Sequence, residues 1–451
     1  MKEFEELSER VRRGMRRLGV PGAALGVYCK GEERFACFGR TSVENPLPVD
    51  EDTMFQIGSI TKTMTATVLM RFVEKGLLDL DRPVREILPK FRMADPGVTR
   101  KVTTRHLLTH TGGWVGDYFD VFGDGDDALR LMVEKIGALK QITPLGEHWS
   151  YNNAGFNIAS RVLEVVSGKP YEAAIREFLF EPLGLGRSFF YPDDVLITHR
   201  FAVGHSKRDG TTVVSRPWAI GRAGNGVGGA ACSIRDLLSY GEFHLRSGAN
   251  AAGKRVMKRD TIERMRKPLV DAGGRGKMGI SWFVRDLGGL VACGHGGATH
   301  GQEAALHFMP GKDFAVALLV NSGSGGNLTD ALLGWAAELW FGAAAAKPAQ
   351  IEAGPGLVEE AAGRYDLPIS AFELKPRKGG LSVVDIPRGG FPTPSTPPGE
   401  ADPPVRAVFC EGDRLLMLDE PRKGSVADFI RGPDGKIAFC RLGGRIHPKV
   451  S

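Results

Sequence analysis

An unusually apolar helix predicted over residues 60–75 constrains the fold more than any other stretch of the sequence. Its large apolar side chains recur every four positions, at Ile60, Met64, Val68 and Phe72. Gly76 ends the pattern, and the run 53–57 before it is typical of a short buried strand. The sequence therefore predicts a buried helix that follows a sharp turn and carries Ser59 and Lys62 at its start.

Two interpretations of Ser59 and Lys62 are open from the pair alone. A lysine held in apolar surroundings is pushed toward its neutral form and can take the proton of a nearby serine hydroxyl. In the alternative interpretation, Ser59 only caps the helix and the Lys62 amine reaches out to water. A serine three residues before a lysine is expected by chance about once in a chain of this size, so a short motif is only a hypothesis.

Composition indicates a globular protein with no nucleic-acid or membrane partner. The chain has 451 residues, of which 42% are hydrophobic and 25% charged, with a net charge of +6. Four arginines between residues 12 and 17 lack interleaved aromatic residues, which favours a solvated helix face over a nucleic-acid patch. No stretch is apolar for long enough to cross a bilayer, and the N-terminus does not resemble a signal peptide.

The six cysteines are scattered and lack the spacing of zinc ligands. We expect reduced thiols and a cytoplasmic location, although Cys29 and Cys37 could face each other across a hairpin. His106 and His110 are four residues apart, but no acidic third ligand follows, so helix packing or capping is favoured over a metal. The glycine-rich run 221–229 does not follow a strand in nucleotide-binding register, which favours a loop lining a cleft. We therefore expect neither a metal nor a cofactor.

The order of predicted elements indicates an α+β fold with two domains. Strands are expected near both ends of a helical middle, which favours one antiparallel sheet flanked by helices. These strands are predicted over residues 23–28, 34–38, 280–284, 289–293, 303–309 and 314–320. A segment rich in alanine, proline and glycine over 343–356 is the expected linker. The predicted domains are 1–345 and, after the linker, a small β-barrel over 356–451 built from short strand-like runs.

Tyr151 and Asn153 form a second candidate stretch, between a loop and a helix. A tyrosine can accept a proton only if nearby cations lower its pKa, and a lysine within reach would do so. Asn153 offers both a donor and an acceptor for a substrate amide or ester. The plain alternative is a helix-capping asparagine beside a buried tyrosine.

A third stretch, His295-Gly296-Gly297-Ala298, follows a predicted strand. Glycines on an edge strand let a substrate approach the backbone closely. Backbone N–H groups there could join the N–H of Ser59 in binding a negative oxygen. A tight hairpin turn is the alternative interpretation.

Together, these three stretches resemble the motifs of the serine β-lactamase and penicillin-binding-protein-like hydrolases. The match is to the branch with class C β-lactamases, esterases and D-amino-acid peptidases, and it covers about residues 5–342. The end of the chain resembles, more weakly, the lipocalin-like barrel attached to some of these enzymes.

The resemblance implies a set of catalytic roles. Ser59 would be the acylated nucleophile, and Lys62 and Tyr151 would share its proton, with the choice of acylation base left open. Asn153 would orient the substrate and Lys62. The N–H groups of Ser59 and Ala298 would bind the oxyanion, with His295 and Gly297 on the substrate-binding strand.

One departure from the family pattern bears on the substrate. Class C β-lactamases carry a lysine at the start of the third motif, where this chain has His295, and histidine is mostly neutral at pH 7. The substitution favours an ester or a short peptide or amide, including those with D-residues, over a β-lactam or a D-Ala-D-Ala peptide. The alternative hypothesis from a different functional class is a sensor that binds a ligand without catalysing a reaction. Self-association through the barrel is a further hypothesis.

Overall fold

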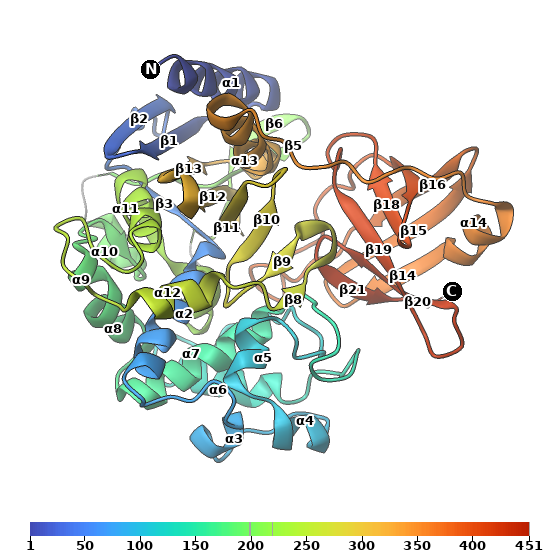
Figure 1. Ribbon diagram of the computed structural model, residues 1–451, viewed down its shortest axis with the longest axis horizontal. Helices are drawn as coiled ribbons and strands as arrows, with labels where there is room; N and C mark the ends of the chain where they lie inside the picture. Colours follow the sequence, from blue (N-terminus) through green and yellow to red (C-terminus); the bar gives the residue numbers. More distant parts are fainter. Residues whose placement is uncertain (198–199, 219, 451) are drawn as a thin grey trace.

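A central antiparallel sheet forms the core of the first part of the chain (Figure 1). The computed structural model describes residues 1–197, 200–218 and 220–450. The sheet has eight strands in the order β2-β1-β13-β12-β11-β10-β9-β8, so strands from both ends of this region lie side by side, as predicted. Its strands are β1 (Gly22–Cys29), β2 (Glu32–Gly39), β8 (Val270–Asp271), β9 (Lys277–Met278), β10 (Phe283–Asp286), β11 (Val291–Thr299), β12 (Gln302–Met309) and β13 (Phe314–Val320).

Helices cover both faces of this sheet (Figure 1). On one face, α1 (Lys2–Leu18) and α13 (Gly326–Phe341) pack through apolar residues such as Leu7 and Leu332. On the other, α11 (Ile234–Leu245) lies against β1, β12 and β13, next to α2 (Ile60–Glu74). Nearly every residue of α2 is buried, so the apolar pattern of the sequence correctly predicted an interior helix.

Further helices, most of them shorter than α2, pack around it or near it and most of them add to the first core. These helices are α3 (Val84–Ile87), α4 (Pro96–Lys101), α5 (Thr104–Leu108), α6 (Ala128–Ile136), α7 (Asn153–Ser167), α8 (Tyr171–Ile175), α9 (Glu181–Leu183), α10 (Pro192–Leu196) and α12 (Arg259–Arg266). Small sheets join β3 (Met54–Gln56), β7 (Ala231–Ser233) and β4 (Ser188–Phe189), and β5 (His205–Arg208) with β6 (Thr211–Val214).

The C-terminal region is an eight-stranded antiparallel barrel with its own apolar core, beside β8, β9 and β10 (Figure 1). Short helix α14 (Pro355–Ala361) precedes it, and a bridge between Tyr365 and Lys449 links its first strand to the segment after its last. Its strands are β14 (Gly363–Leu367), β15 (Ser370–Arg377), β16 (Gly380–Ile386), β17 (Val405–Cys410), β18 (Arg414–Met417), β19 (Val426–Arg431), β20 (Ile437–Leu442) and β21 (Arg445–Pro448). The sequence did not predict β21.

Two further details differ from the sequence expectations. Strand β11 does not end at Cys293 but continues to Thr299, so the third motif lies inside a strand rather than in a hairpin turn. The glycine-rich run forms two short helical turns, η2 (Arg222–Gly224) and η3 (Asn225–Gly229). Cys29 and Cys37 remain free thiols. In the part of the chain that the structure describes, no helix is long and apolar enough to span a membrane.

Candidate active site

Ser59 lies at the turn between β3 and α2, and its hydroxyl is not used to cap the helix. The side chain immediately precedes α2, yet it makes no capping hydrogen bond to the helix. Gly58 has a φ of 50°, a left-handed conformation that residues with a Cβ rarely adopt. The capping interpretation of Ser59 is therefore wrong, and the glycine explains how the chain turns so sharply there.

Lys62 points from the first turn of α2 toward Ser59 and is completely buried. Its exposed fraction is 0%, so the interpretation of a lysine reaching out to water is also wrong. Its Nζ lies 2.9 Å from Ser59 Oγ and 2.8 Å from the carbonyl oxygen of Val227 in η3. The ring of Tyr151 lies 5.0 Å from the same nitrogen.

The surroundings of Lys62 favour its neutral amine. Burial lowers its pKa well below the usual 10.5, nearby Arg445 lowers it further, and Asp117 opposes the shift. Desolvation penalises the charged form of an amine. A neutral amine at this distance can accept the proton of the Ser59 hydroxyl.

Tyr151 reaches the same point from the loop before α7. Burial raises its pKa and the contact of its hydroxyl with Ser59 lowers it, for a net rise to about 12. The phenol is therefore protonated at neutral pH and is a proton donor in this state. His110 holds this loop in place. Its ring stacks on the Tyr151 ring with 4.4 Å between the ring centroids, and its Nδ1 accepts a 2.9 Å hydrogen bond from Asn152 N–H.

Strand β11 comes into direct contact with the turn that carries Ser59. A Cβ on Gly297 would lie 1.9 Å from the Ile57 carbonyl oxygen and 2.8 Å from the nitrogen of Ser59. A Cβ on Gly58 would lie 2.5 Å from the nitrogen of Ala298. Only glycine permits such contact, so the absence of two side chains brings the backbone of Ala298 next to that of Ser59.

His295 lies on the same strand, with its ring 6.0 Å from the Tyr151 ring and 5.2 Å from that of Phe283. Burial lowers its pKa to about 3, against a small opposing effect of its contact with the Gly296 carbonyl. His295 is therefore neutral at physiological pH, as the sequence analysis expected of a histidine in this position.

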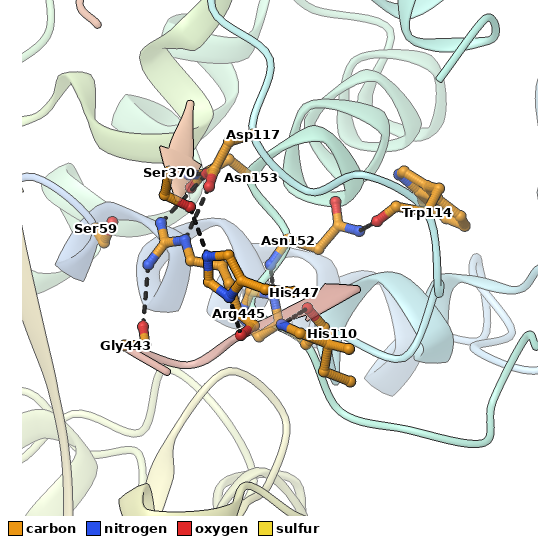
Figure 2. A network of polar contacts seen from close by, with 12 residues as sticks. Ser59, His110, Trp114, Asp117, Asn152, Asn153, Ser370, Gly443, Arg445 and His447 are labelled. Atoms are coloured by element: carbon orange, nitrogen blue, oxygen red, sulfur yellow. Dashed lines mark hydrogen bonds and ion pairs between the residues drawn. The ribbon is translucent and has the colours of Figure 1, made fainter. Parts of the chain in front are cut away.

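Asn153 belongs to a buried polar network that the sequence did not predict (Figure 2). Its Nδ2 donates to Asp117 Oδ1 over 2.5 Å, and its Oδ1 has no partner among the described residues. No hydrogen bond joins Asn153 to Lys62 within the described part of the chain. The side-chain oxygen of Asn153, Oδ1, is thus available to accept a hydrogen bond from a ligand.

Arg445, from the start of β21, completes this network. Its Nε and Nη2 donate to the two carboxylate oxygens of Asp117 over 2.8 and 3.2 Å, and Figure 2 shows its side chain directed from the barrel toward Asp117. The guanidinium carbon lies 5.0 Å from the Tyr151 ring. Burial raises the pKa of Asp117, but Arg445 and Asn153 outweigh it and leave the pKa lowered. Asp117 is therefore ionised and neutralises the arginine.

The hairpin between β20 and β21 is packed onto the loop that carries Trp149 and Tyr151. The backbone N–H of Tyr151 donates to the carbonyl of Gly444 over 2.8 Å, and Arg441 donates to the carbonyl of Trp149 over 3.0 Å. A Cβ on Gly444 would lie 3.1 Å from the Trp149 ring. The barrel therefore forms one wall of the site.

The structure brings Ser59, Lys62, Tyr151 and β11 together, whereas the two histidines of the 106–110 segment serve other purposes. His106 accepts a bond from Thr103 N–H at the start of α5, as predicted for a capping role. Within the described ranges no group of three or more His, Cys, Asp or Glu is placed to hold a metal ion. Sequence reasoning missed Asp117, Arg445 and the Val227 carbonyl. The missing lysine of the third motif was the one signal in the sequence for a cation from another segment, such as Arg445.

Comparison with protein families gives a match to the β-lactamase family model over residues 7–338. The chain belongs to the β-lactamase family. Penicillin-binding protein 4 of Amycolatopsis lactamdurans is 34% identical over 311 residues, which are 67% of this chain and 81% of that protein. Esterase EstB of Burkholderia gladioli is 36% identical over 153 residues, 31% of this chain and 38% of the esterase.

The similarity to one of the solved structures extends over the central sheet and the C-terminal barrel. The crystal structure of SurE superposes with a TM-score of 0.77 at 25% identity and covers 100% of this chain and 99% of that one. The superposition thus includes both the central sheet and the C-terminal barrel of this chain.

The neutral state of Lys62 predicts a pH effect on stability. In the unfolded chain the amine carries its proton below about pH 10.5, whereas the buried amine does not, so unfolding takes up a proton. As the pH rises toward 10.5, wild type should therefore gain stability relative to Lys62→Met, by up to about 1.4 kcal/mol per pH unit. Urea unfolding of both proteins measures this difference. Lys101→Met, at an exposed position, is the control, and its free energy of unfolding should differ from that of wild type by the same amount at every pH. If the difference between wild type and Lys62→Met also stays constant with pH, Lys62 is not neutral in the folded protein.

The ion pair of Arg445 with Asp117 predicts a non-additive effect. Arg445→Met leaves the buried Asp117 carboxylate unpaired and should lower the free energy of unfolding by about 3–5 kcal/mol. The double variant Arg445→Met, Asp117→Leu should recover most of that loss, because no charge then stays buried alone. Urea unfolding followed by tryptophan fluorescence checks both. Equal or greater loss in the double variant would argue against the pairing.

Proposed function

We propose that this protein is a serine hydrolase that forms an acyl-enzyme on Ser59 from an ester or a short peptide or amide, including those with D-residues. The observation that carries the proposal is the buried Lys62 amine 2.9 Å from Ser59 Oγ, in surroundings that lower its pKa well below the usual value. A serine hydroxyl needs such a base to attack a carbonyl. Membership of the β-lactamase family and the partial likeness to esterase EstB support the reaction class.

In the proposed acylation, Ser59 Oγ attacks the substrate carbonyl carbon while its proton passes to Lys62 Nζ. The negative oxygen that forms lies between the backbone N–H groups of Ser59 and Ala298, whose close approach the glycines permit. Collapse of this intermediate breaks the bond to the leaving group, which takes a proton from the Tyr151 hydroxyl. Tyr151 regains a proton from Lys62, and water then reverses the sequence to release the acid.

The pKa shifts favour Lys62 over Tyr151 as the base for acylation. The lowered pKa of Lys62 gives a free amine, while Tyr151, raised to about 12, holds its proton. A proton acceptor and a proton donor on either side of one hydroxyl are suited to general base and general acid roles. Asn153 Oδ1, His295 and Gly297 are proposed to line the substrate.

A β-lactamase or D-Ala-D-Ala carboxypeptidase is the second candidate. The likeness to penicillin-binding protein 4 favours it, but His295 is neutral where a lysine would hold a substrate carboxylate. Arg445 is a nearby cation, yet its charge is balanced by Asp117. A ligand sensor has no need of a deprotonated amine beside a serine.

A cytoplasmic location and self-association through the barrel stay predictions; the unbridged cysteines agree with a reducing compartment.

Covalent labelling and kinetics test this function. A fluorophosphonate probe should add to Ser59, located by peptide mass spectrometry, and Ser59→Ala should lose labelling while the exposed Ser395→Ala keeps it. On a chromogenic ester, Lys62→Met should lower kcat/KM by about 10²–10⁴-fold, as expected for loss of a general base. Comparing the ester with a D-aminoacyl anilide and a cephalosporin identifies the branch. Labelling of the Ser59→Ala protein, or full activity without Lys62, would refute the mechanism.

A further inference from the structure

The backbone carbonyl that contacts Lys62 belongs to a segment with little rigidity of its own. Val227 lies in η3, whose five residues include three glycines, and glycine loses more conformational freedom on folding than any other residue. The short turn η2 comes immediately before it. The position of the Val227 carbonyl therefore depends on the contacts that the rest of the protein makes with η2 and η3.

The Val227 carbonyl bears on the direction in which the Lys62 amine can act as a base. A neutral amine has two N–H donors and one lone pair, so it can donate to one neighbour while it accepts a proton from another. Its Nζ lies 2.8 Å from the Val227 carbonyl oxygen, which can only accept, and 2.9 Å from Ser59 Oγ, whose hydroxyl can donate. An N–H directed at Val227 leaves the lone pair for Ser59.

One buried carboxylate contacts both η2 and η3. Glu172 of α8 is 6% exposed, and its Oε1 accepts a 2.7 Å hydrogen bond from Nδ2 of Asn225, the first residue of η3. The same carboxylate accepts from Nε and Nη2 of Arg222, the first residue of η2, each over 3.3 Å. Hydrogen bonds to a carboxylate are stronger than those between neutral groups. The short contact between Glu172 and Asn225 is therefore well suited to hold η3 against α8.

The other contacts of η3 come from α2 and α7. A Cβ on Gly226 would lie 1.9 Å from Ser160 Oγ of α7, so the glycine allows η3 to pack closely there. Thr65 of α2 donates to the Gly226 carbonyl over 2.9 Å. These contacts position the middle of η3, whereas the hydrogen bond between Asn225 and Glu172 positions its start. Without that hydrogen bond, one end of this glycine-rich turn would lose its link to the protein core.

Glu172 acts on the base through position rather than through charge. Among the described residues, the charges that shift the pKa of Lys62 are those of Arg445 and Asp117. The Glu172 carboxylate is paired with Arg222 instead. Loss of its contact with η3 should therefore affect the base through movement of the turn.

We propose that Glu172 and Asn225 are positioning residues for the general base. Their hydrogen bond holds η3 so that the Val227 carbonyl accepts an N–H of Lys62 and the lone pair of the amine faces Ser59. Neither of the two residues takes part in bond breaking. The proposal rests on the proposed function, because Lys62 is a base only in that reaction.

A kinetic test separates the hydrogen bond from the ion pair. Asn225→Ala removes the donor and leaves Glu172 paired with Arg222, whereas Glu172→Gln keeps an oxygen acceptor for Asn225 and loses the charge. On a chromogenic ester, Asn225→Ala should lower kcat about 10–100-fold and change KM less than about threefold, because a small displacement of a catalytic group slows the chemistry. Glu172→Gln should keep kcat within about threefold of wild type. Glu177→Gln, at an exposed position nearby in the sequence, is the control and should leave kcat unchanged.

Rates are expressed per active site, from the amount of Ser59 that a fluorophosphonate labels at completion, so that loss of folded protein is not counted as slower chemistry. Equal kcat for wild type and Asn225→Ala, or a change in KM alone, overturns the proposal. An equally large loss of kcat in Glu172→Gln also overturns it, because the charge and not the hydrogen bond would then be what the base requires.

Hydrogen exchange measures the hold on η3 without any turnover and so separates this proposal from the proposed function. In a Ser59→Ala background, adding Asn225→Ala should raise the exchange rate of the backbone amides of residues 222–230 at least about tenfold, as expected for loss of a hydrogen bond to a charged group. Adding Glu177→Gln instead should not. Unchanged exchange overturns the proposal even if esters are hydrolysed. Faster exchange supports the hold on η3 even if wild type forms no acyl-enzyme, and in that case the proposed function is what fails.

Discussion

The burial of the Lys62 amine beside the Ser59 hydroxyl is the interaction on which the rest of the site depends. Among the described residues no carboxylate contacts this amine, and burial lowers its pKa well below the usual value, which favours the neutral form that the proposed mechanism needs as a base. The fold achieves this by burying most of α2 within the first apolar core. Stability and chemistry are thus connected: the apolar helix that fills the core also lowers the proton affinity of its single lysine.

The C-terminal barrel contributes directly to the candidate site. The β20–β21 hairpin accepts the backbone N–H of Tyr151 and brings Arg445 to Asp117, which in turn holds Asn153. These links join the barrel to one wall of the catalytic cleft.

Local sequence patterns predicted the parts of the fold that depend on neighbouring residues. The period of α2 and most long strands of the central sheet follow from local apolar patterns, and the three motifs from their resemblance to a family. Asp117 and Arg445 are 328 residues apart, and no local pattern encodes such a pair. Strand β11 was expected to end at Cys293 because glycines disfavour strands, yet Gly297 is required where the strand meets Ile57. The contact of Lys62 with the Val227 carbonyl was not predicted, because every residue has a backbone oxygen and the sequence does not indicate which of them will be a hydrogen-bond partner.

The protonation state of Lys62 is the most direct test of the account. Selective ¹³C labelling of lysine, with the Lys62 resonance assigned by comparison with Lys62→Met, gives the titration of its side chain by NMR in the folded protein. The account predicts the chemical shift of a neutral amine at pH 7, with no titration near the usual lysine pKa of 10.5. A resonance that is charged at pH 7 and titrates near 10.5 would contradict it, because the resting enzyme would then have no base beside Ser59.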